Sequence, residues 1–109
     1  MIQVRYAVEP ELETEQFVNL LHRSTLALRR PVNETERIRT MLQHADVVIT
    51  ARVDGQLVGV SRAITDFAYC THLSDLAVHQ RHQRHRRQGI GRELLRRTHQ
   101  ARRATTTEG

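Results

Sequence analysis

The chain lacks lysine and tryptophan, and its 109 residues include one cysteine, two tyrosines and two phenylalanines. With no second cysteine, Cys70 forms no disulfide within the chain, which is typical of a reducing cytosol. No apolar run approaches the ~20 residues of a membrane-spanning helix. The N-terminus does not show the basic-then-apolar pattern of a signal peptide. We therefore expect a single cytoplasmic domain without membrane association, long enough for one modest core.

Positive charge, all of it arginine, is concentrated near the C-terminus. Residues 1–78 carry eight arginines and ten acidic residues, whereas residues 79–109 carry nine arginines and two acidic residues. Such a basic segment predicts an anionic partner. A site for single-stranded nucleic acid usually has aromatic residues among its arginines, because the bases stack on them. No aromatic residue follows Tyr69 in this chain. A duplex-backbone binder and a solvated basic helix face stay open as alternatives.

Hydrophobic periodicity predicts the element order β-α-α-β-β-β-α. Asp54-Gly55 is a strong hairpin signal, Pro10 is expected to open the first helix, and Asn33 with Glu36 resembles a capping box. The predicted strands are residues 2–8, 47–53, 57–67 and 71–79, and the predicted helices are residues 10–22, 34–43 and 89–103.

The segment between the last predicted strand and the last predicted helix indicates an anion site. The apolar residues Leu76-Ala77-Val78 end the strand, an arginine-rich loop follows, and Gly89 and Gly91 open the helix. Backbone N–H groups and the positive end of a helix dipole meet at such a point, as a pyrophosphate requires. Glycine allows the phosphate to approach the amides closely. Neither a Walker Gly-Lys-Ser/Thr nor the leading glycine of a dinucleotide fingerprint is present.

These residues resemble the acetyl-CoA motif of the GCN5-related N-acetyltransferase (GNAT) superfamily, Arg/Gln-x-x-Gly-x-Gly/Ala between the fourth strand and the next helix. The match is Arg86-x-x-Gly89-x-Gly91, preceded by Ser74-Asp75-Leu76-Ala77-Val78 and followed by Arg92-Glu93-Leu94-Leu95. The resemblance covers residues 1–103 as one partial N-acetyltransferase domain and leaves residues 104–109 as a polar tail. It implies an α/β (α+β) fold with a mixed, mostly antiparallel sheet. It also implies acetyl transfer from acetyl-CoA to a primary amine of a small molecule or protein.

The resemblance further implies roles for individual residues. A backbone N–H within residues 76–78 would bind the oxyanion, and the loop and helix start would bind the phosphates. The implied cofactor-binding residues are Leu76, Ala77, Val78, Arg86, Arg87, Gln88, Gly89, Ile90, Gly91 and Arg92. His72 and Asp75 are the candidates for the catalytic base. The alternatives are that Asp75 is a hydrogen-bonding strand residue and His72 a half-buried packing residue. Residues 26–31, between the first two helices, are expected to meet the acceptor.

Two features depart from the family pattern. Gln80-Arg81-His82 is repeated as Gln83-Arg84-His85. The longer loop costs little closure entropy but loosens the phosphate cradle, so we expect weaker cofactor binding. Relatives also continue beyond the last helix into a further strand, past which the tyrosine general acid lies. The chain thus resembles a C-terminally truncated acetyltransferase, and a homodimer or strand-donating partner is expected to cover the edge of strand 71–79.

Several interpretations therefore stay open. The chain is a working acetyltransferase that borrows a strand, an inactive CoA-binding remnant, a nucleic-acid-binding module through residues 81–103, or a decayed product without activity. His79, His82 and His85 are spaced three apart, but the arginines between and beside them would repel a cation, so we expect no metal.

Overall fold

The structure is a computed structural model, and it describes residues 3–24, 33–65, 71–79 and 89–108. Its elements are β1 (Arg5–Val8), α1 (Thr14–His22), α2 (Thr35–Gln43), β2 (Val47–Val53), β3 (Gln56–Thr65), β4 (Thr71–Val78) and α4 (Ile90–Glu108). This order confirms the predicted β-α-α-β-β-β-α arrangement. None of the helices in these ranges is both long enough and apolar enough to cross a membrane.

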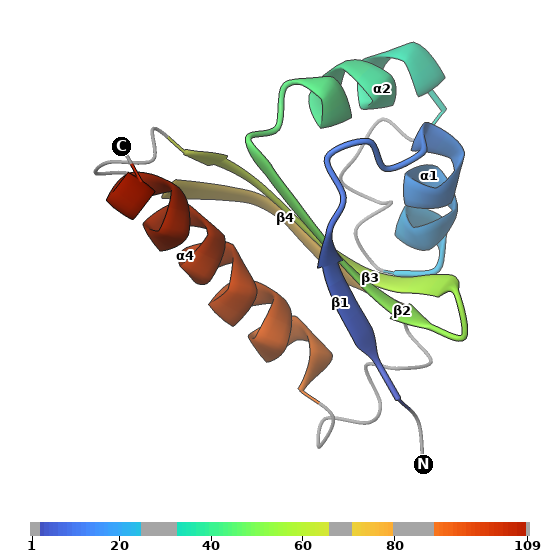
Figure 1. Cartoon of the computed structure of the whole chain (residues 1–109). Coiled ribbons are helices and arrows are strands. Elements are labelled where there is room, and N and C mark those ends of the chain that lie inside the picture. The colour runs from blue at the N-terminus through green and yellow to red at the C-terminus, as the bar shows by residue number, and fades with distance from the viewer. Residues whose placement is uncertain (1–2, 25–32, 66–70, 80–88, 109) are drawn as a thin grey trace.

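The four strands form one sheet in the order β1-β2-β3-β4 (Figure 1). All three pairings between them are antiparallel, in agreement with the predicted mostly antiparallel sheet. The β2–β3 hairpin turns at Asp54 and Gly55, whose φ angles are 51° and 82°. Two positive φ values in succession are what a tight turn with the twist of a hairpin requires.

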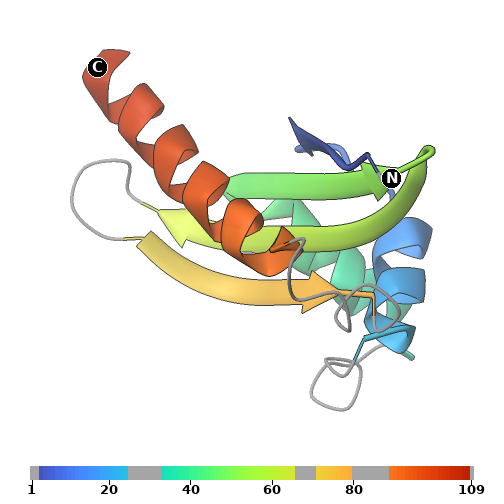
Figure 2. The same ribbon diagram turned by 90° about the horizontal axis from the view of Figure 1, so that it is seen from below.

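The two faces of the sheet carry different helices, with α1 and α2 on one face and α4 on the other (Figures 1 and 2). Phe17 and Leu21 of α1 and Ile38 of α2 have no exposed surface and pack on one face. Ile90 and Leu94 of α4 are buried on the other. Phe17 and Leu21 are four residues apart, as are Ile90 and Leu94, which is the spacing of side chains on one face of a helix.

Gly59 in β3 sets how closely α4 approaches the sheet. A Cβ at this position would lie 3.1 Å from Leu94 Cδ1, 3.2 Å from Ile90 Cγ2 and 3.3 Å from Ala51 Cβ. These distances are shorter than an ordinary van der Waals contact, so glycine lets the first turns of α4 lie directly on the strands. The register shifts beside this point, because Ala51 pairs with Gly59 while Arg52 pairs with Leu57.

The largest differences from the predicted boundaries occur at helix ends. The first helix begins at Thr14 rather than at Pro10, because the Leu12 N–H donates to the Glu9 carbonyl (3.2 Å) and Glu13 is extended. The predicted capping box at Asn33 is wrong, since the residue that caps α2 is Glu34 and it makes no side-chain cap hydrogen bond. The last helix continues to Glu108, through most of the predicted polar tail.

Candidate functional site

The helix α4 begins in the geometry of an anion-binding site. Gly89 has a φ of +60°, and its carbonyl accepts a hydrogen bond from the Glu93 N–H at 2.9 Å. The helix therefore starts directly after Gly89. The amides of residues 90–92 precede the first turn's hydrogen bonds and have no carbonyl partner within the helix. These amides and the helix dipole favour a negatively charged group.

The C-terminal half of β4 lies beside this helix start. A Cβ on Gly91 would lie 3.9 Å from both Leu76 Cδ2 and Val78 Cγ2. Ala77 and Val78 are buried and Leu76 is half-buried, while Arg92 is exposed on the first turn of α4. The structure thus brings the described residues predicted to bind the cofactor to one place. Arg86, Arg87 and Gln88, together with the repeat at 80–85, lie outside the described residues.

A β-bulge interrupts β4 next to this place. Arg62 pairs with Asp75 and Ala63 with Leu73, so Ser74 has no partner of its own on β3. A bulge bends the strand and redirects its backbone groups, and bulges recur beside active sites. The bulge separates the N-terminal part of β4, which carries His72, from the part beside α4.

Asp75, one of the two candidates for the base, is buried in an ion pair. Its carboxylate accepts a hydrogen bond from Arg62 Nε, and its side chain has no exposed surface. Arg62 Nη1 also donates to the Met41 carbonyl of α2 (3.4 Å), so the pair lies between the sheet and α2. This geometry is that of a hydrogen-bonding strand residue, the alternative that the sequence left open. His72 lies opposite Ile64 in the register, and its side chain is outside the described structure.

The first turn of α4 also carries a charge cluster. The Nε atoms of Arg96 and Arg97 donate hydrogen bonds to the Glu93 carboxylate, at 2.9 Å and 2.7 Å. These hydrogen bonds lower the pKa of Glu93 to about 2. Glu93 is thereby directed toward the following turn of its own helix. Arg97 also lies over the Tyr6 ring, 4.7 Å from its centroid. The pKa of Tyr6 is raised by burial and by the charge of Glu93, against the opposing effect of Arg97.

In residues 3–24, 33–65, 71–79 and 89–108, no three His, Cys, Asp or Glu side chains gather closely enough to hold a metal ion. His79 is included in these ranges, whereas His82 and His85 are not.

The sequence profile of the acetyltransferase (GNAT) family matches residues 11–104, most of the chain and the whole of this site. The chain belongs to the GNAT family. The predicted family and fold class are therefore confirmed. No curated protein matches the chain significantly.

Solved structures share the GNAT fold. A probable acetyltransferase from meticillin-resistant Staphylococcus aureus is 21% identical with a TM-score of 0.70, over 93% of this chain and 68% of that one. An aminoglycoside 6′-N-acetyltransferase complexed with coenzyme A is 18% identical with a TM-score of 0.73, over 92% of this chain and 56% of that one. An aminoglycoside acetyltransferase from an uncultured soil metagenomic sample, in complex with sisomicin, is 23% identical with a TM-score of 0.65, over 96% of this chain and 72% of that one. The chain thus spans between about half and three quarters of the length of the GNAT structures that it matches.

Sequence reasoning missed three features that position the site. They are the close approach at Gly59, the buried Arg62 that pairs with Asp75, and the bulge at Ser74. An isolated glycine inside a strand and an arginine within a mostly apolar strand are weak signals for the first two. The bulge depends on the pairing between two strands, so the sequence of either strand alone carries no pattern that predicts it.

Proposed function

We propose that this GNAT-family chain binds acetyl-CoA between the start of α4 and β4 and transfers the acetyl group to a primary amine. The observation that carries the proposal is the start of α4 after Gly89, set beside Leu76 and Val78. The Gly91 position has no Cβ to occupy the space next to the helix amides. A cofactor pyrophosphate fits the chemistry of these groups. The coenzyme A named for one structure of the same fold also supports the proposal.

Bound acetyl-CoA supplies an activated thioester, and the chain's own groups bind and orient it. We assign phosphate binding to the amides of residues 90–92, to Arg92 and to the predicted loop residues Arg86, Arg87 and Gln88. A backbone N–H within residues 76–78 is assigned to the oxyanion. His72 is the remaining candidate for the base, since Asp75 is committed to its pair with Arg62. We assign the acceptor to residues 26–31 and the site of action to the cytoplasm.

Two glycines provide a matched test of cofactor binding. Gly89 and Gly55 both have positive φ, and a Cβ on either would meet nothing within 4 Å. Gly89→Ala and Gly55→Ala should therefore each cost about 1–2 kcal/mol of unfolding free energy through backbone strain alone. Only Gly89 lies at the proposed phosphate site, whereas Gly55 lies in the β2–β3 turn.

The measurement is the shift in melting temperature caused by acetyl-CoA, with ADP as comparison. A ligand at about 100 times its Kd stabilises a protein by roughly 2.7 kcal/mol, which a melt resolves easily. We expect a saturable shift in melting temperature that is larger for acetyl-CoA than for ADP. Gly55→Ala should keep the affinity for acetyl-CoA, and Gly89→Ala should lower it at least about tenfold. The absence of a shift in the unaltered chain, or equal losses in both variants, would contradict the proposed site.

Turnover is tested separately from binding. Release of free CoA thiol should depend on an added primary amine, and sisomicin belongs in the panel because a neighbour of the same fold is named in complex with it. A melting shift without thiol release would support the CoA-binding remnant instead of the enzyme. Salt-sensitive binding of duplex DNA without an acetyl-CoA shift would support the nucleic-acid alternative.

A further inference from the structure

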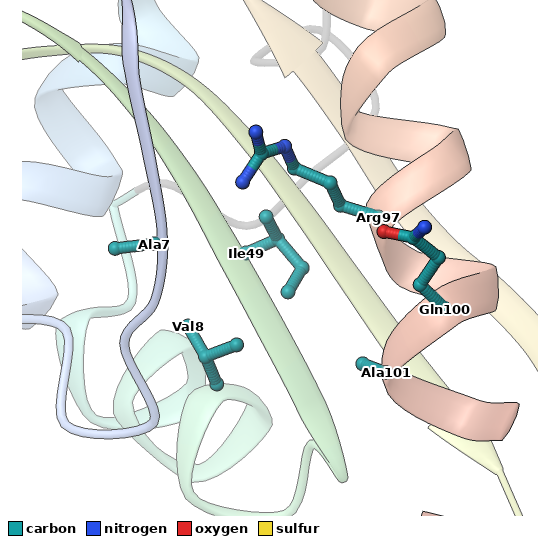
Figure 3. Close-up of a pocket in the computed structure, with 6 residues that line it drawn as sticks. All are labelled: Ala7, Val8, Ile49, Arg97, Gln100 and Ala101. Atoms are coloured by element: carbon teal, nitrogen blue, oxygen red, sulfur yellow. The ribbon is translucent and has the colours of Figure 1, made fainter. Parts of the chain in front are cut away.

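A cavity lies between β1, β2 and the middle of α4 (Figure 3). Its volume is about 260 Å³. Val8 and Ile49 project into it from neighbouring strands, where they are direct partners in the register. Among the described residues, the lining consists of Ala7, Val8, Ile49, Arg97, Gln100 and Ala101. Most of this lining is aliphatic.

Among the described residues that line the cavity, the polar side chains come from α4 alone. Arg97 and Gln100 extend from α4 beside it, opposite the aliphatic side chains of the strands (Figure 3). Arg97 uses its Nε atom for Glu93 and one face of its guanidinium for the Tyr6 ring, so among the contacts of the described residues its two Nη atoms stay available as hydrogen-bond donors. Its side chain is 40% exposed, which leaves the guanidinium accessible to a ligand. Val8 is 60% exposed, so the cavity is open on the β1 side and its rim there is apolar.

The size of the cavity limits its ligand. A cavity of about 150 Å³ lined by aliphatic and aromatic side chains is enough to hold benzene. The cavity described here therefore has room for a benzene-sized apolar body with a short chain, and is smaller than most sites for drug-sized molecules. A guanidinium with free Nη atoms pairs best with a planar carboxylate.

The cavity is distinct from the proposed acetyl-CoA site. That site uses β4, whereas the cavity uses β1 and β2 toward the opposite edge of the sheet. Arg97 and Ala101 follow Ile90 by seven and eleven residues, which places them roughly 10 to 16 Å along the helix axis. A ligand in the cavity and a phosphate at the helix start can therefore be told apart by the residues that they perturb.

We propose that this cavity binds a small carboxylate with an apolar body, held by the Arg97 guanidinium and the Gln100 amide over Val8, Ile49 and Ala101. The aliphatic floor removes the apolar body from water, and the two donors fix the acid at the rim.

The test is a two-dimensional amide NMR titration of the full chain with phenylpropionate, phenylpropanol and phenylpropylamine. These probes share the apolar body and differ in the charge of the head group. We expect saturable shifts at Val8, Ile49 and Ala101, with phenylpropionate binding at least about tenfold more tightly than phenylpropanol because its hydrogen bonds are charge-assisted. Phenylpropylamine should bind most weakly, since it places a cation beside Arg97.

Arg96 provides the matched control. It also pairs with Glu93, but it is more exposed and does not line the cavity. Arg97→Gln should remove the preference for the acid, and Arg96→Gln should keep it. Ala101→Leu should weaken all three probes by filling the cavity, with a thermal melt reporting that the variant is folded. Equal binding of acid and alcohol, equal loss in both arginine variants, or shifts centred on residues 76–78 and 89–92 would each overturn the proposal.

Discussion

Replacing Gly59 by alanine tests whether one missing side chain sets the position of α4. The added Cβ would lie 3.1 to 3.3 Å from Leu94 Cδ1, Ile90 Cγ2 and Ala51 Cβ. Each of these three residues is at most 3% exposed, so none of them can move into solvent to make room. The new methyl group must therefore be accommodated by moving α4 outward or by bending the strands.

Two opposing contributions determine the size of the effect. Forcing an extra carbon into a packed core costs typically ~1–3 kcal/mol. Alanine in a strand regains ~0.5–1 kcal/mol that glycine loses through its backbone entropy. The packing cost is larger, so we expect Gly59→Ala to lower the unfolding free energy by about 1 kcal/mol. For a chain of this length this corresponds to a fall in melting temperature of roughly 4 °C.

The assay is chemical denaturation of Gly59→Ala, Leu94→Ala and the double variant. Leu94→Ala alone should cost ~2–5 kcal/mol because it leaves a cavity. It also removes the Cδ1 atom nearest to the added methyl group. In the double variant, Gly59→Ala should therefore cost less than it does alone, and the difference is a coupling energy of ~0.5–3 kcal/mol between contacting residues.

Strict additivity of the two substitutions would refute this reasoning, as would a Gly59→Ala variant at least as stable as the unaltered chain. Either result would mean that α4 is not in tight contact with β3 at this point. The close approach that places Gly91 beside β4 would then have to arise elsewhere.

Three further predictions concern buried or paired polar groups. In urea denaturation, Arg62→Met should cost ~3–5 kcal/mol by leaving a buried carboxylate without its arginine, and adding Asp75→Leu should recover much of that loss. Thr98→Val should cost ~1–3 kcal/mol because the buried Ser61 hydroxyl of β3 loses its hydrogen-bond partner at 2.7 Å, whereas Thr98→Ser should keep the bond and cost less. Hydrogen bonding from Arg52 lowers the pKa of Glu9 below its ordinary 4.5, so this pair's contribution to stability is present above that pH and is lost as the pH falls through the folded-state pKa. Carboxyl NMR titration should show the pKa of Glu9 rising in Arg52→Gln, and an unchanged value would contradict the pair.

The order of the elements could be predicted because each carries a local signal. The strand predicted over residues 47–53 and the Asp54-Gly55 turn give the first hairpin, and the structure has both where predicted. The stripe of Phe17, Leu20 and Leu21 likewise identifies the buried face of α1. These signals are local because side-chain periodicity follows from the backbone geometry of a single element.

The placement of Asp75 could not be predicted in the same way. Its role depends on Arg62, thirteen residues earlier, and Arg62 in turn donates to the Met41 carbonyl of α2. The same acidic residue at the edge of an open cleft would be a plausible base. Which environment it has is decided by strand register and by the bulge at Ser74, and both are properties of two strands together.

The fixed position of α4 also bears on the repeated tripeptide before it. Ile90 and Leu94 are buried against Gly59 and the strands, and these contacts do not involve residues 80–88. The start of the helix is therefore held by the core independently of the length of the loop that leads to it. Three extra residues add only a few tenths of a kcal/mol to the closure entropy of a flexible loop. The fold should tolerate the repeat, and we expect its effect to appear in the proposed binding of acetyl-CoA instead.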